Sequence, residues 1–296
     1  MTTDDALRRL AFAVAYRMLG AVGDAEDVAQ EALIRLHREA EDVENPEAFV
    51  TTVATRLAID VLRSARARRE TYTGSWLPEP LVEDPALRRV EDDDTISLAF
   101  LLLLERLTPE ERAVLVLREA FDYPFAEIAR IVDKSEQNCR QILTRARRRI
   151  DDERPRFDPD PEQRHELAAR FLRAARDGDM DGLIALLSPQ VVLTGDGGGK
   201  ARALPRPLVG AAGAARALAA FYELGERWGI TFEPVIVNGQ PGFRSLDPEG
   251  RLANVVGIDV DGGRIVRVHS ILNPDKLAHL GPLSTAALRP SARQPE

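Results

Sequence analysis

The period of the hydrophobic pattern changes part-way along this chain of 296 residues, and that change limits the possible folds most. Up to Arg176, apolar residues recur every three to four positions, which indicates amphipathic helices. Beyond Arg176 they gather in short runs of strand length, bounded by Gly, Asn and Asp. These runs are residues 190–195, 230–239, 253–260 and 263–272. Helices followed by a series of strands predict all-α domains with an α+β domain behind them.

Two segments rich in proline and acidic residues divide the helical half of the chain. Helices are predicted over 7–19, from an N-cap at Asp24 to residue 38, and from Pro46 onward. Thr108 and Glu111 form a capping-box pattern that starts a later helix. The pair Asp261-Gly262 predicts a hairpin turn between the last two strands. The expected divisions are 1–70, an acidic linker 71–95, 96–151, a second linker 152–161, the α+β domain 162–280 and a tail 281–296.

The net charge of −8 argues against a nucleic-acid binder, but the distribution of the charges reverses that impression. Residues 56–69 hold five arginines against Asp60 alone, and residues 134–150 hold six bases against Glu136 alone. Between them, residues 79–94 hold seven acids against two arginines. Two basic segments separated by an acidic one predict two separate surfaces for a polyanion rather than a generally solvated face.

The composition is that of a globular protein that does not enter a membrane. The longest uncharged apolar run, Ile96 to Leu104, is shorter than the ~20 residues of a membrane span. The N-terminus is acidic and lacks the apolar core of a secretory signal. The single cysteine, Cys139, excludes an internal disulfide and fits a reducing compartment. We therefore expect a cytoplasmic protein.

The segment DGGGK, residues 196–200, is similar to a phosphate-binding loop but fails the comparison. The Walker pattern needs a glycine where this chain has Thr194 and a hydroxyl residue where it has Ala201. The prolines that follow are also unsuited to starting the helix whose N-terminus would face a phosphate. The sequence therefore excludes a nucleotide loop here.

Residues 125–150 have the spacing of a helix-turn-helix, with a short helix over 125–132, a turn at 133–134 and a second helix capped by Ser135. In that motif the start of the second helix faces base edges, and later basic residues reach phosphates. The expected base-edge residues are Ser135, Glu136, Gln137, Asn138, Arg140 and Gln141. The expected backbone contacts are Arg145, Arg147 and Arg148. From spacing alone, a helical hairpin with a solvated basic face stays open as an alternative.

Three stretches taken together resemble the extracytoplasmic-function (ECF) sigma factors. They are DAEDVAQEALIRLHR (24–38), NPEAFVTTVATRLAIDVLRSARARR (45–69) and LTPEERAVLVLREAFDYPFAEIARIVDKSEQNCRQILTRARRRI (107–150). The resemblance implies that residues 1–70 are sigma region 2 and that 96–151 are the region 4 helix-turn-helix. It also implies two partners: core RNA polymerase, and promoter DNA read at its −10 and −35 elements.

The resemblance assigns roles to residues that match the family's segments. Core-polymerase binding falls on Asp24, Glu26, Asp27, Gln30 and Glu31. Contact with the −10 strand falls on Arg56, Asp60, Arg63 and Arg66. The loop 41–45 lies where the family holds a base out of the stack. The −35 element falls to the second helix of the helix-turn-helix named above.

Three further motifs resemble those of the SigJ-type ECF group, whose members carry a SnoaL-like cone domain behind the DNA-binding regions. They are Trp76, Leu77, Pro78, Glu79 and Pro80; Asp196, Gly197, Gly198, Gly199 and Lys200; and Asn273, Pro274, Asp275, Lys276 and Leu277. The resemblance implies that DGGGK is a turn at the end of a strand, where the WLPEP segment docks. It also implies a built-in regulator, so that a separate anti-sigma factor is unnecessary.

The cone fold usually encloses a pocket, which a small ligand would occupy. The candidate lining residues are Trp228, Phe171, Tyr222, Asp196 and His269. We expect no catalytic residue, metal ligand or cofactor. Two other readings stay open: a stand-alone helix-turn-helix regulator, and a polyketide-cyclase-type enzyme that uses Asp196 and His269 as an acid/base pair.

Overall fold

The structure is a computed structural model that describes residues 3–39, 43–70, 72–83, 96–150 and 161–285. The chain divides into two compact units, one formed by 1–71 with 100–154 and the other by 72–99 with 155–296. The first unit is all-α and the second is α+β, so the predicted fold class is confirmed. The residues on both sides of the acidic stretch, 72–83 and 96–99, group with the α+β unit.

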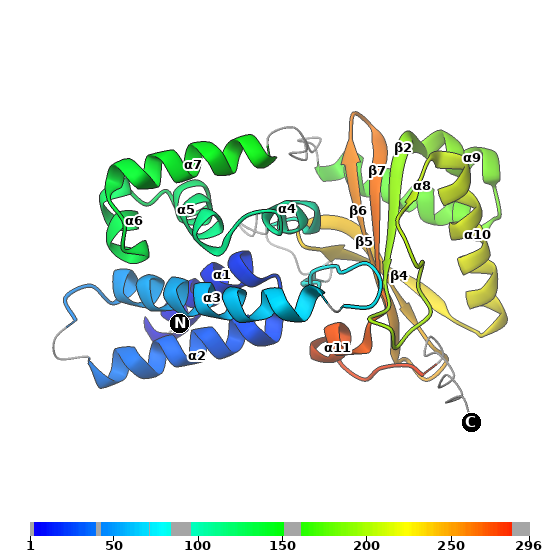
Figure 1. The fold of residues 1–296 in the computed structure, drawn as a ribbon. Coiled ribbons are helices and arrows are strands. Elements are labelled where there is room, and N and C mark those ends of the chain that lie inside the picture. The colour runs from blue at the N-terminus through cyan, green and yellow to red at the C-terminus, as the bar shows by residue number, and fades with distance from the viewer. Residues whose placement is uncertain (1–2, 40–42, 71, 84–95, 151–160, 286–296) are drawn as a thin grey trace, which may run out of the picture. The chain divides into compact units, whose positions relative to one another are not determined.

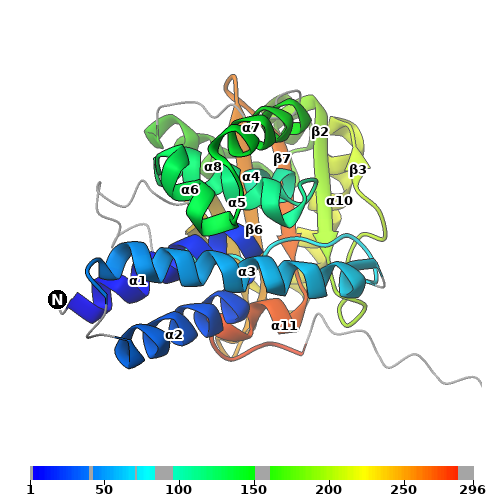
Figure 2. The ribbon, with the colours of Figure 1, turned by 60° about the vertical axis from the view of Figure 1, so that its left-hand side comes forward.

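The helical unit begins with α1 (Thr3–Leu19), α2 (Val22–Arg38) and α3 (Pro46–Glu70), which pack against one another (Figure 2). Their contacts are made by small and branched side chains such as Ala11, Val14 and Ala54, all of which are fully buried. Helix α2 starts two residues before the expected N-cap at Asp24. Asp24 therefore lies in the first turn, where a carboxylate is favoured by the helix dipole.

The helices that follow before the second unit are α4 (Leu98–Leu104), α5 (Pro109–Glu119), α6 (Phe125–Val132) and α7 (Glu136–Ile150). The capping box is confirmed: Thr108 Oγ1 accepts the Glu111 N–H at 3.3 Å, and Glu111 accepts the Thr108 N–H at 3.0 Å. Asp133 ends α6 in the left-handed conformation, and Ser135 Oγ accepts the Asn138 N–H at 3.2 Å. The predicted helix-turn-helix is therefore present, and Ser135 caps its second helix as expected.

The α+β unit contains a seven-stranded sheet in the order β1-β4-β5-β6-β7-β2-β3, in which only β2 and β7 are parallel. The strands are β1 (Val82–Glu83), β2 (Leu187–Asp196), β3 (Leu208–Val209), β4 (Thr231–Val237), β5 (Gln240–Leu246), β6 (Leu252–Asp261) and β7 (Arg264–Ile271). Helices α8 (Pro161–Arg176), α9 (Met180–Leu186) and α10 (Ala211–Arg227) cover one face of the sheet (Figure 1). The core between helices and sheet contains Phe171, Leu183, Leu218, Phe243 and Ile258.

The prediction of the strands was incomplete. The hairpin turn at Gly262 and Gly263 is confirmed, but strand β5 was missed, and so was the turn that Asn238 and Gly239 form before it. The short α11 (Pro274–Leu277) and a 3₁₀ turn (Ala278–Leu280) follow the last strand.

The segment 72–83, called the linker segment below, is part of this sheet unit. Strand β1 pairs with the edge strand β4, and Leu81 and Asn238 exchange hydrogen bonds of 3.0 and 2.9 Å. The Asn238 amide also donates to the Ile96 carbonyl at 3.0 Å. Two residues further along the chain, Leu98 lies so near Gly257 that a Cβ added to Gly257 would come within 3.0 Å of the Leu98 side chain. The linker segment and the start of α4 therefore dock on the rest of the α+β unit, called the cone below, rather than extending freely.

Candidate functional site

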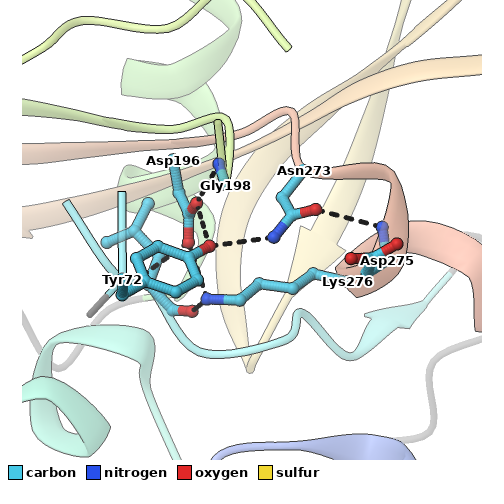
Figure 3. A network of polar contacts seen from close by, with 7 residues as sticks. Tyr72, Asp196, Gly198, Asn273, Asp275 and Lys276 are labelled. Carbon is cyan, nitrogen blue, oxygen red and sulfur yellow. Dashed lines mark hydrogen bonds and ion pairs between the residues drawn. The ribbon is translucent and has the colours of Figure 1, made fainter. Parts of the chain in front are cut away.

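Asp196, the last residue of β2, stands at the centre of a buried polar network and is itself 0% exposed. Its Oδ2 accepts hydrogen bonds from the Lys276 ammonium at 2.6 Å and from the Leu77 N–H at 2.8 Å. Its Oδ1 accepts from the Tyr72 hydroxyl at 2.5 Å and from the Gly198 N–H at 3.0 Å (Figure 3). The carboxylate therefore has four donors, as a charge withdrawn from water requires.

The same network joins the linker segment to the C-terminal NPDKL motif. The Asn273 side-chain amide donates to the Tyr72 hydroxyl at 2.8 Å (Figure 3). The Lys276 ammonium also donates to the Leu77 carbonyl, and it lies 4.8 Å from the ring centre of Tyr72 and 4.3 Å from that of Trp76. Two aromatic rings thus add cation–π contacts to the ion pair. We call Tyr72, Trp76, Leu77, Asp196, Asn273 and Lys276 the motif cluster.

The backbone around the cluster explains two of the three glycines of DGGGK. Gly198 and Gly199 have φ of 55° and 75°, in the left-handed region that glycine tolerates best. A Cβ on Gly198 would also clash with the side chain of Asn273. Asn273 in turn caps α11 by accepting the Asp275 N–H at 3.1 Å. The segment is a turn at the end of a strand, as expected.

Burial and the hydrogen bond to Asp196 both raise the pKa of Tyr72, burial being the larger cause. The phenol therefore stays protonated and donates to the carboxylate. At the rim of the cluster, Lys200 and Asp275 form a second ion pair at 2.6 Å, but both side chains are more than half exposed. The two ion pairs thus differ in burial although they join the same two motifs.

The rest of WLPEP is also held against the cone. The His279 ring is hydrogen-bonded to the Pro80 carbonyl at 2.9 Å. Pro78 and Leu277 are buried, and Glu79 is half-buried. Tyr72, Asn238 and His279 were missed by the sequence analysis. Two sequence signals were available: Tyr72 is an aromatic residue four positions before Trp76, and Asn238 is followed by glycine in a turn pattern.

The residues expected at the −10 strand follow one exposed stripe of α3, where Arg56, Asp60 and Arg63 are spaced at helical intervals. Arg56 donates to the Ile131 and Arg130 carbonyls at the end of α6, both at 3.0 Å. Arg63 donates to Glu110 of α5 at 2.6 Å. Arg56 and Arg63 are therefore bonded to residues of α6 and α5 in this structure. The Arg66 side chain and residues 41–42 lie outside the described residues.

The residues expected to bind polymerase lie on α2. Glu26, Asp27 and Gln30 are exposed, whereas Asp24 and Glu31 are half-buried. Glu31 forms an ion pair with Arg35 at 2.8 Å one turn later. The opposite side of the helix packs on α1 and α3, so the acidic residues lie on the side that faces away from this packing.

On α7 the residues expected at the −35 element lie on the solvent side, opposite the buried Cys139, Ile142 and Ala146. Asn138 is half-buried; the exposed members are Ser135, Glu136, Gln137, Arg140, Gln141, Arg145, Arg147 and Arg148. Arg140 pairs with Glu136 at 2.9 Å, and Arg147 pairs with Glu119 of α5 at 2.7 Å.

The prediction for the cone pocket was partly wrong. Tyr222 lines a cavity, Phe171 is a core residue, and Trp228 is 44% exposed at the rim of a smaller cavity. Asp196 and His269, however, lie on the face of the sheet that points away from the helices, because the neighbouring Leu193 and Val268 face the core. His269 instead pairs with Asp259 at 2.8 Å, and Asp196 belongs to the motif cluster. They do not form an acid/base pair in the cavity.

Within the described ranges, none of the helices is long and apolar enough to cross a membrane.

The comparisons with known families match three consecutive parts of the chain. Residues 5–68 match Sigma-70 region 2, residues 97–150 match Sigma-70 region 4, and residues 168–271 match the SnoaL-like domain. The first two matches cover the helices that carry the exposed acidic and basic faces. The third covers the sheet and the helices that bury its core.

Curated relatives align over nearly the whole length. The ECF RNA polymerase sigma factor SigJ of Mycobacterium tuberculosis (strain ATCC 25618 / H37Rv) is 36% identical, over 98% of this chain and 96% of its own. The probable ECF sigma factor SigI of the same species (strain CDC 1551 / Oshkosh) is 32% identical, over 89% and 90%. The crystal structure of M. tuberculosis SigJ superposes with a TM-score of 0.76 at 33% identity, covering 94% of this chain and 98% of that one. With two sigma regions, a fused SnoaL-like domain and relatives of this length, the chain belongs to the ECF RNA polymerase sigma factors, in the SigJ-type group.

Proposed function

We propose that this protein binds core RNA polymerase in the cytoplasm and directs it to promoters with defined −10 and −35 elements. The observation that carries the proposal is the alignment with SigJ over 98% of the chain, with both sigma regions in order. A stand-alone helix-turn-helix regulator is not favoured, because such a protein has no use for the region 2 helices at residues 5–68.

We propose that three helices of the sigma regions each bind a different partner. The acidic residues of α2 would bind polymerase, the arginine stripe of α3 would hold the −10 strand, and the start of α7 would read the −35 element. Arginines along a groove suit single-stranded DNA because they neutralise phosphates whatever the base. Most of these side chains on α2 and α7 are exposed, which supports the assignment. The arginines of α3 are bonded to two carbonyls and a carboxylate in this structure. We propose that they exchange these partners for the phosphates of the −10 strand.

We propose further that the fused cone regulates the factor through the motif cluster, without a separate anti-sigma factor. The linker segment follows region 2 and precedes region 4, so its docking on the cone restricts where the two regions sit relative to each other. The supporting contacts are those of Tyr72 and Leu77 with Asp196, and of Leu81 with Asn238. A tethered contact has a millimolar effective concentration, so even a weak interface would be largely occupied.

The part of the chain that follows Leu277 adds a restraint of its own. His279 is bonded to the Pro80 carbonyl, and Leu252 exchanges backbone hydrogen bonds with Pro282 and Ser284. A chain ending after Leu277 would keep Asn273 and Lys276 but lose these contacts. We expect it to fold and to transcribe more than the full chain. The cone itself acts as a regulator here and not as an enzyme, in keeping with its sigma-factor relatives.

Run-off transcription with purified core polymerase tests the proposal. The full chain should support transcription from its promoter, and the chain ending after Leu277 should support more. Trp76→Ala should lower transcription by loosening the linker segment, and a chain ending after Pro161 should give little or none. Lys200→Met, at the exposed pair beside the cluster, is the matched control and should be unchanged. Equal transcription by the full chain and the Pro161 truncation would show that the cone is a passenger.

A further inference from the structure

The cone holds a cavity of about 520 Å³ between α8, α10 and the strands β4 and β5, apart from the motif cluster. Its wall is mainly apolar and includes Leu172, Ile230, Phe232, Pro234 and Val235. Ligand pockets in proteins usually measure about 300–1,000 Å³. This cavity falls in that range, whereas a neighbouring one under α10 measures about 260 Å³. Size and an apolar wall therefore favour the larger cavity as a binding site.

One polar group of the wall lacks a partner. Tyr222 is 2% exposed, its ring packs 4.1 Å from that of Phe232, and its hydroxyl makes no hydrogen bond within the described part of the chain. Burial raises the pKa of this phenol, so it carries its proton and offers a donor. A buried donor without an acceptor costs folding free energy, and a ligand oxygen that reached it would remove that cost.

The rim of the cavity carries charge. Arg173 and Arg176 of α8 and Glu226 of α10 line it, all with exposed side chains. Arg176 also pairs with the exposed Asp177 at 3.3 Å, a contact that solvent screens. The positive charge of Arg176 also acts on the Tyr222 phenol and lowers its pKa, an effect smaller than that of burial, which raises it. The lining groups thus combine two cations, one carboxylate and a neutral donor with an apolar wall, and the cations outnumber the acid.

We infer that this cavity binds a small organic carboxylate with an apolar body, whose carboxylate accepts hydrogen bonds from the Tyr222 hydroxyl and the Arg176 guanidinium. A carboxylate has two oxygens and so takes both donors at once, and guanidinium–carboxylate pairs are among the stronger polar contacts. The hydrocarbon part fills the space against Leu172 and Phe232. A neutral analogue of the same shape would leave the arginine unpaired. The inference concerns binding alone and does not depend on the transcriptional role.

Calorimetric titration of the full-length protein tests this, with 4-phenylbutyrate as probe and 4-phenylbutan-1-ol as its neutral counterpart. The carboxylate should bind at least about tenfold more tightly than the alcohol. Tyr222→Phe and Arg176→Gln should each weaken the carboxylate about tenfold or more, the loss expected for a hydrogen bond to a charged group. Arg216→Gln changes an exposed arginine of α10 that lies outside this cavity, and should have no effect.

Three results would overturn the inference: no binding at millimolar carboxylate, equal binding of acid and alcohol, or an equal loss in Arg216→Gln. A thermal melt accompanies each variant, and Tyr222→Phe should melt at or above the temperature of the wild type because it removes an unpaired hydroxyl. If Tyr222→Phe folds poorly, the exposed Arg176 still decides the matter through its own variant. Binding without any change in transcription would leave the inference standing, because the inference concerns binding alone.

Discussion

The ammonium group of Lys276 lies 2.6 Å from Oδ2 of Asp196, and the two side chains are 8% and 0% exposed. This ion pair joins the NPDKL motif to the end of β2, and through the Leu77 N–H and carbonyl it also holds the linker segment. A buried pair stabilises a fold only when its remaining donors and acceptors are satisfied. Here Tyr72, Gly198 and Leu77 satisfy them, so the pair is the point at which three distant segments depend on one another.

Replacing Lys276 with Met should strongly destabilise the cone unit. It leaves the fully buried Asp196 carboxylate without its cation, a change that typically costs about 3–5 kcal/mol. Lys200→Met removes the exposed pair with Asp275 between the same two motifs and should cost less than about 1 kcal/mol. Urea denaturation followed by circular dichroism measures both. Similar losses in the two variants would mean that the Lys276 pair is not the one that holds the cluster.

The phenol of Tyr72 makes the docking of the linker segment sensitive to alkaline pH. Its pKa is raised in the folded protein by burial and by Asp196, so the unfolded chain loses the proton first as the pH rises. The contribution of Tyr72 is therefore complete below about pH 10, the value of an unperturbed tyrosine, and is lost progressively above it. Tyr72→Phe should lower the free energy of unfolding by about 1–3 kcal/mol at pH 8.

The difference between wild type and Tyr72→Phe should then shrink as the pH rises beyond 10. Urea denaturation at a series of pH values from 8 upward gives this difference directly, and other titrating groups cancel because both proteins share them. A difference that stays constant or grows with pH would contradict the assigned hydrogen bonds.

Release of Arg63 from Glu110 should favour promoter opening. We propose above that Arg63 contacts the −10 strand, but here its guanidinium donates a hydrogen bond to Glu110 of α5. Because the pair is partly exposed, its loss should be worth at most about 1 kcal/mol, or roughly fivefold in affinity. Glu110→Gln should therefore raise the affinity of the polymerase complex for a fluorescent −10 single strand by up to about fivefold.

Anisotropy titration measures that affinity. Glu223→Gln, which removes a comparable exposed partner from Arg227 in the cone, serves as the control and should leave it unchanged. An affinity that is lowered by Glu110→Gln, or raised equally by both variants, would speak against the contact as a restraint on region 2.

Local rules predicted the helical part well and the sheet less well. Thr108 and Ser135 cap their helices as expected, because capping depends on residues three positions apart. Strand β5 escaped because Pro241, Gly242 and Arg244 interrupt its apolar pattern; on that strand Gly242 leaves room for the backbone of β6. Neither the pairing of β1 with β4 nor the role of Asn238 follows from local pattern, since both depend on contacts more than a hundred residues apart.

The motif cluster was predicted in part, and the pocket residues show why the rest was not. The meeting of the three motifs followed from a family resemblance, whereas the role of Tyr72 required the position of its hydroxyl. Asp196 and His269 were assigned to the cavity because they are polar residues on strands of the cone. Which face a strand residue occupies depends on register, and a shift by one position moves it to the opposite side. The sequence pattern did not give the register of these strands, so it could not show which face of the sheet Asp196 and His269 occupy.

The roles of base reading and phosphate contact should divide along α7. Gln137 and Arg140 lie in its first two turns and are exposed, where a helix in the major groove meets base edges. Changing either to Ala should alter the preference among promoter variants at the −35 element, by about 1–3 kcal/mol for each lost contact. Arg147 lies two turns later, paired with Glu119, and would exchange that partner for a phosphate. Arg147→Ala should weaken binding to all promoters alike and lower the salt slope of binding by about one.

Titrations of the polymerase complex against a set of −35 variants at several salt concentrations separate the two effects. The assignment would have to be reversed if Arg147→Ala changed sequence preference while the Gln137 and Arg140 variants changed only affinity.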